Sequence, residues 1–228
     1  MNALARLAAL AVCLAIFCPI AAATEPSLLA LMPLPREALG PDAAALQLVK
    51  GSGLDSNADA ARHAGDGFTA ADLARAGRIT GYTLDYARPG MSRLNAAHPL
   101  VEVQTIAELY RDEARATKGL AFWRSVTRVL AAGKPNGFTV VVSPFAARVG
   151  DGAFAFELTL WRGGKPRLYV GDIVFRTGDL LGAVFVTVTH DAGLRARSIE
   201  LAGKLSARIQ RVAAGKVQEP AVTLPAKN

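Results

Sequence analysis

Cysteine is confined to the first eighteen residues of this 228-residue chain, at Cys13 and Cys18. Both lie in the apolar stretch 7–20, which is too short to span a bilayer as a helix. One positive charge precedes this stretch and three alanines follow it, which is the pattern of a secretory signal peptide over 1–23 with cleavage near Ala23. The chain that remains after cleavage has no cysteine. A disulfide, a thiol nucleophile and a cysteine-ligated metal site are thereby excluded for it.

Two other interpretations of the leader stay open, a retained membrane anchor and a lipid-modified cysteine. Phe17 precedes Cys18 and Val12 precedes Cys13, whereas a lipid-attachment signal usually has a small residue there. We expect an exported protein, located in the periplasm or outside the cell, that is stabilised by its core alone.

Recognisable catalytic motifs are also lacking. The sequence has no His-Glu-x-x-His segment, no Gly-x-Ser-x-Gly elbow and no phosphate-binding Gly-x-x-x-x-Gly-Lys loop. His63, His98 and His190 each stand alone in their segments, which argues against a zinc site. We therefore expect no enzyme, no cofactor and no metal. A hydrolase in which Asp172 and His190 converge in a cleft is the alternative.

The formal net charge is +7, but no run of five basic residues occurs. Scattered basic residues are typical of a solvated surface, and an exported protein is not expected to bind nucleic acid. A peripheral contact of the basic helix predicted over 192–214 with an anionic polymer or lipid is the alternative. The oligomeric state is not predicted.

Apolar residues are abundant, at 51% of the chain, and they follow clear periods. Enough chain remains after the leader for one domain with a sizeable core, so we predict a single domain over 24–214 and a disordered tail over 215–228. Period-two patterns predict strands, and three- to four-residue spacings predict helices. The predicted strands are 78–87, 100–110, 138–145, 152–162, 167–176 and 180–189, and the predicted helices are 69–77, 111–133 and 192–214. A lead-in (24–41) and a mixed segment (42–68), loop-like over 50–67, precede them.

Short turns between adjacent strands favour a mainly antiparallel sheet, and strands and helices occur in separate runs, so we predict an α+β fold. The hairpin 169–189 is apolar on both faces. A strand of this kind needs cover on both sides. We expect helices on both faces of the sheet, as an α/β/α sandwich, with a dimer covering one face as the competing explanation. The strand 100–110 carries Glu102, Gln104 and Glu108 on one face, which we interpret as wetter.

Asp85 and Asp172 stand inside apolar strands, and a buried carboxylate must be paired or hydrogen-bonded. We expect each to bind an arginine or a loop backbone; the alternative is a polar group in a ligand pocket. Aromatic residues in the sheet and its covering helix are the other candidates for such a pocket. The candidate ligand-binding residues are Tyr82, Trp123, Trp161 and Asp172.

The order of elements resembles that of the Mog1/PsbP-like group of exported domains, which includes LpqN-type lipoproteins and extracellular sensor domains of bacterial receptor kinases. The segments concerned are the lead-in LLALMPLPREALG, the short helix into GRITGYTLDYA, the strand and helix VEVQTIAELYRDEARATKGLAFW, the meander up to VFVTV and a closing helix. The resemblance implies an antiparallel sheet between helices and a binding or scaffolding role without catalytic residues.

These observations together favour an exported, non-catalytic binding module that recognises a small apolar ligand or an envelope partner. The alternative is an envelope-associated structural protein that uses its basic helix.

Overall fold

The computed structural model describes residues 24–65, 67–89, 99–132 and 137–222. The predicted signal peptide lies outside these residues. The strands are β1 (Gln47–Leu48), β2 (Gly53–Asp55), β3 (Arg78–Ala87), β4 (Leu100–Tyr110), β5 (Thr139–Pro144), β6 (Gly152–Arg162), β7 (Lys165–Thr177) and β8 (Leu180–Val188). The α-helices are α1 (Asn57–Ala64), α2 (Ala70–Ala76), α3 (Glu113–Ala132) and α4 (Leu194–Ala213), and the lead-in forms the 3-10 helices η1 (Pro26–Leu31), η2 (Arg36–Leu39) and η3 (Pro41–Ala45).

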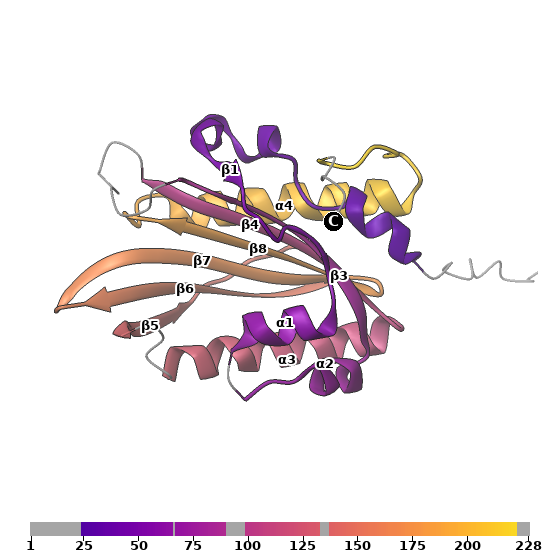
Figure 1. Cartoon of the computed structure of the whole chain (residues 1–228), viewed down its shortest axis with the longest axis horizontal. Coiled ribbons are helices and arrows are strands. Elements are labelled where there is room, and N and C mark those ends of the chain that lie inside the picture. The colour runs from indigo at the N-terminus through magenta and orange to yellow at the C-terminus, as the bar shows by residue number, and fades with distance from the viewer. Residues whose placement is uncertain (1–23, 66, 90–98, 133–136, 223–228) are drawn as a thin grey trace, which may run out of the picture.

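The described strands form one sheet in the order β1-β3-β4-β8-β7-β6-β5, with β2 also paired to β3. Every pairing in it is antiparallel. Helix α4 and the lead-in cover one face of the sheet, and α3 with α1 and α2 covers the other (Figure 1). The predicted α+β fold with helices on both faces is confirmed.

The central hairpin β7–β8 explains why its sequence is apolar in both directions. Ile173 and Val184 belong to the core that faces α4, whereas Val174 and Ala183 belong to the core that faces α3. Helix α4 approaches β7 closely at Gly171, where a Cβ would lie 2.1 Å from Ser198 Oγ. Both faces are therefore covered within one chain, without a partner copy.

The basic side chains of α4 bind the lead-in. Arg208 Nε donates to the carbonyl of Leu31 at 2.7 Å, and Lys204 Nζ donates to that of Ala38 at 3.2 Å. Arg197 donates to the carbonyl of Leu39 and forms an ion pair with Asp42 at 3.1 Å. These charges satisfy carbonyl groups of the short 3-10 helices.

The segment 42–68, predicted as mixed and as loop-like over 50–67, is more ordered than expected. It contains η3, β1, β2 and α1, and α1 begins at a capping box formed by Ser56 and Asp59. Helix α1 is only eight residues long, and its buried face consists of the alanines Ala60, Ala61 and Ala64 and has no large apolar side chain. The neighbouring prediction is confirmed, since Thr69 and Asp72 form a capping box and Gly77 ends α2 in the left-handed conformation at φ 98°.

After α4 the chain turns back onto the domain. Val217, Ala221 and Val222 pack against the core on the α4 side. The rest of the segment predicted as a disordered tail, 223–228, lies outside the described residues. Within the part of the chain that the structure describes, no helix is long and apolar enough to cross a membrane.

Candidate ligand-binding site

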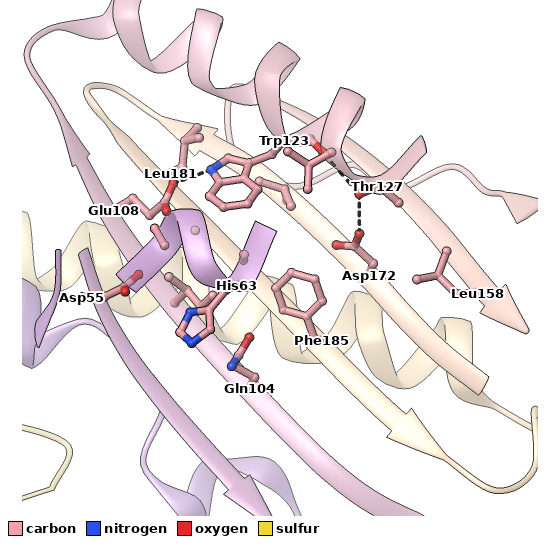
Figure 2. A pocket seen from close by; sticks show the side chains of 16 residues that line it. Asp55, His63, Gln104, Glu108, Trp123, Thr127, Leu158, Asp172, Leu181 and Phe185 are labelled. Atoms are coloured by element: carbon pink, nitrogen blue, oxygen red, sulfur yellow. Dashed lines mark hydrogen bonds between the residues drawn. The ribbon is translucent and has the colours of Figure 1, made fainter. Parts of the chain in front are cut away.

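A cavity of about 170 Å³ lies between the sheet and the helices α1 and α3. Its floor comes from β4, β7 and β8, and its roof from Trp123, Val126 and Thr127 of α3 and Ala60 and His63 of α1 (Figure 2). Most of its surface is apolar. The remaining lining residues are Asp55, Gln104, Ile106, Glu108, Leu158, Asp172, Val174, Leu181, Gly182, Ala183 and Phe185.

One end of the cavity is built on a buried arginine. The Arg78 side chain is fully buried, and its Nη2 and Nε lie 2.8 Å from Asp55 Oδ2 and from Glu108 Oε1. Its Nη1 also donates to the Asp55 carbonyl at 3.2 Å and to Asn57 Oδ1 at 2.9 Å. A Cβ at residue 81 would lie 2.4 Å from Arg78 Nη2, so Gly81 makes room for the guanidinium.

Glu108 accepts hydrogen bonds from three side chains. In addition to Arg78, Tyr110 Oη donates to Glu108 Oε2 at 3.0 Å and Trp123 Nε1 donates to the same oxygen at 2.8 Å. Tyr110 fits beneath α3 because residue 119 is glycine, where a Cβ would lie 2.3 Å from the tyrosine ring. The interpretation of this face of β4 as wetter is therefore wrong at Glu108, which is only 4% exposed.

Asp55 retains one free oxygen despite its pairing with Arg78. Its Oδ1 is buried and has no hydrogen-bond partner among the described residues. Burial raises the pKa of Asp55, and the positive charge of Arg78 opposes this effect. This end of the cavity therefore has two carboxylates and one arginine.

Asp172 lies at the other end, on β7, and is 2% exposed. Its Oδ2 lies 3.1 Å from Thr127 Oγ1, which is also 3.2 Å from the carbonyl oxygen of Trp123. The hydroxyl has one proton, so it can donate to only one of these acceptors at a time. A protonated Asp172 satisfies both contacts by donating to Thr127, which then donates to the carbonyl.

The second oxygen of Asp172, Oδ1, is buried and has no partner among the described residues. Burial raises the pKa of Asp172 to about 7, and the hydrogen bond with Thr127 lowers it by less. Figure 2 shows Asp172 next to Phe185 and below Thr127, with Asp55 at the opposite side of the lining.

The two acidic ends are well separated. Asp172 pairs with Phe185 and Phe185 pairs with Gln104, which stands four residues before Glu108 on β4. At the usual strand dimensions, the backbones of Asp172 and Glu108 are roughly 17 Å apart. The intervening lining is mainly apolar and aromatic.

Two of the four candidate residues predicted from the sequence line the cavity, and the other two lie elsewhere. Trp123 and Asp172 line the cavity. Tyr82 packs against the core on the α4 face, and Trp161 lies near the outer end of β6, opposite Thr139 of the edge strand, 36% exposed. The sequence did not single out Asp55, Arg78, Thr127 or Phe185. One available signal was the charged Arg78 at the start of an apolar strand, whose burial depends on contacts distant in sequence.

Each of Asp85 and Asp172 was expected to bind an arginine or a loop backbone. In the part of the chain that the structure describes, neither carboxylate forms an ion pair with arginine, and Asp172 contacts the Thr127 hydroxyl of α3 instead. Asp85 stands beside Glu102, and burial and then this like charge raise its pKa to about 7. Asp172 and His190 do not converge either. Asp172 lies under α3, whereas His190 borders a groove beside α4.

Comparison with known proteins identified a shared fold. No family model matches the chain, and no curated protein matches it. The crystal structure of the extracellular domain of PknH from Mycobacterium tuberculosis is similar, with a TM-score of 0.51 at 12% identity. The match covers 80% of this chain and 97% of that domain. At this identity the likeness concerns the fold, and it agrees with the similarity to receptor-kinase extracellular domains expected from the order of elements.

Proposed function

We propose that this protein is an exported, non-catalytic binding module that holds a small, mainly apolar molecule between its sheet and helix α3. The observation that carries the proposal is the cavity itself, an apolar space with a few buried polar groups at its ends. Such concave, largely pre-formed sites are where proteins usually bind small molecules. The likeness to an extracellular domain supports a role outside the cytoplasm.

The size of the cavity supports a ligand of about one ring. An engineered apolar cavity of about 150 Å³ in another protein binds benzene. The cavity here is slightly larger, and Trp123 and Phe185 offer aromatic surface to a ring. The cavity reaches solvent beside two of its lining residues, His63, which is exposed, and Gln104, which is half-buried.

The alternative role for α4, an electrostatic contact with an anionic surface, has less support. Arg197, Lys204 and Arg208 hold the lead-in in place. A basic side chain that satisfies carbonyl groups of its own domain is less available to a polymer or lipid.

The two tryptophans allow a direct test. The variant Trp161→Phe leaves Trp123 as the one tryptophan of the chain, inside the cavity lining. We expect toluene to change the emission of Trp123 and to raise the unfolding temperature, because a ligand that binds only the folded state stabilises it.

The control adds Ala183→Met to the Trp161→Phe background. The longer side chain fills the cavity from β8 and should abolish both effects. An emission of Trp123 that does not respond to toluene, together with an unchanged unfolding temperature, would contradict the proposal.

A further inference from the structure

We infer that the ligand carries a positively charged amine, which binds the free oxygen of Asp172 while its apolar body lies against Trp123 and Phe185. This inference rests on the proposed function and specifies the chemistry of the molecule that the site takes.

The first support is the state of Asp172. The residue is 2% exposed, its Oδ2 is held by Thr127, and its Oδ1 has no partner among the described residues. A buried polar atom without a partner destabilises a fold, and native proteins rarely keep one without a role. An ammonium or other N–H donor in the cavity would supply the missing hydrogen bond.

The second support is the charge of the lining. Asp55, Glu108 and Asp172 face the cavity, and His63 is the basic residue that lines it. Arg78 stands behind the lining and is paired with Asp55 and Glu108. The surroundings are therefore acidic although the whole chain is basic, at +7. An anionic ligand would be repelled and a cationic one attracted.

The third support is the position of the aromatic residues relative to Asp172. Phe185 pairs directly with Asp172 across β7 and β8, and Trp123 lies one helical turn before Thr127 on α3. A cation that binds Asp172 thus lies close to aromatic rings, whose faces attract positive charge. The acidic cluster around Arg78 is too distant for the same small molecule to bind it at the same time.

A ligand series tests the inference on the wild-type protein. Benzylamine, toluene and benzoate have similar apolar bodies and differ in charge. We expect benzylamine at pH 8 to bind about tenfold more tightly than toluene, because a hydrogen bond to a charged group is among the stronger ones. Benzoate should bind more weakly than toluene. Calorimetric titration or ligand-detected NMR gives the three dissociation constants.

Variants then assign the preference to one residue. In Asp172→Asn the advantage of benzylamine over toluene should disappear, and in the control Asp191→Asn, which changes an exposed aspartate outside the cavity, it should persist. In the wild type the advantage should fall between pH 8 and pH 5.5, where Asp172 becomes protonated. Because His63 also lines the cavity, the loss is assigned to Asp172 only if Asp172→Asn does not show it.

The outcomes separate this inference from the proposed function. Equal dissociation constants for benzylamine and toluene would overturn the inference that the ligand carries an amine, and would leave the proposed apolar site unaffected. Absence of binding for both would overturn both proposals. An advantage of benzylamine that survives in Asp172→Asn would overturn the assignment to Asp172. The comparison on the wild type needs no variant to fold.

Discussion

The indole Nε1 of Trp123 donates a hydrogen bond of 2.8 Å to Oε2 of Glu108, and this contact joins helix α3 to strand β4 across the cavity. Glu108 is held in turn by Arg78 and Tyr110. The same tryptophan thus belongs to the roof of the cavity and to the buried polar network at its end. A substitution at Trp123 therefore changes both the cavity lining and this network.

Replacing Trp123 with phenylalanine should lower the free energy of unfolding by about 1–3 kcal/mol, because it removes a hydrogen bond to a buried charged group. Urea unfolding followed by circular dichroism measures the change. The control Trp161→Phe affects an aromatic residue at the outer end of β6 and should change the stability by less than about 0.5 kcal/mol. Equal effects of the two substitutions would argue against the Trp123–Glu108 contact.

Arg78→Met should be far more damaging. The substitution leaves Asp55 and Glu108 buried without their shared positive partner, and breaking a buried ion pair from one side costs about 3–5 kcal/mol. The exposed Arg75, which pairs with Asp72 on the surface of α2, provides the matched control. Because surface ion pairs contribute about 0–1 kcal/mol, Arg75→Met should be nearly neutral. Both values come from chemical unfolding, and a tolerated Arg78→Met would refute the network as described.

Two helical glycines should respond in opposite directions to alanine. In α3, Gly119→Ala places a Cβ 2.3 Å from the Tyr110 ring, and the overlap should destabilise the protein by about 1–3 kcal/mol. In α4, a Cβ at Gly203 meets nothing within 4 Å, so Gly203→Ala should stabilise the protein by about 0.5–1 kcal/mol through helix propensity. Thermal unfolding of the two variants measures this, and the same sign for both would contradict the close packing of Tyr110 on α3.

Asp172 should make the stability depend on pH. Its pKa is raised from an ordinary 3.8 to about 7, so the unfolded chain releases this proton at lower pH than the folded protein does. The contribution of Asp172 to the free energy of unfolding is at its maximum below pH 4. It falls by about 4 kcal/mol in all as the pH rises through 7. Asp172→Asn should therefore stabilise the protein more at pH 8 than at pH 4. Unfolding at the two pH values gives the difference, and Asp191→Asn should lack it.

The layers of the fold followed from local patterns. The apolar faces of 169–189 predicted cover on both sides, and α3 and α4 supply it. The cap signals at Thr69, Asp72 and Gly77 predicted α2 closely. Such signals are local, because a capping box or an alternating strand needs only a few neighbouring residues.

The site was predicted less completely, because its polar groups meet through distant contacts. Asp172 was expected to bind an arginine or a loop backbone, but the buried Arg78 binds Asp55 and Glu108, and Asp172 contacts Thr127. Which carboxylates pair with Arg78 depends on the register of β3 with β4 and on the placement of β2. Neither can be obtained from spacing along the chain.

The most direct test of the proposed binding site is an NMR measurement of contacts between toluene and the protein methyl groups. The cavity predicts intermolecular NOEs to Val126, Leu158 and Val174, which line it. Ile173 and Val184 neighbour these positions but face α4, so they should show none. Contacts to Val174 without contacts to Ile173 would support the site between the sheet and α3. Contacts confined to the α4 face, or no contacts at saturating toluene, would contradict it.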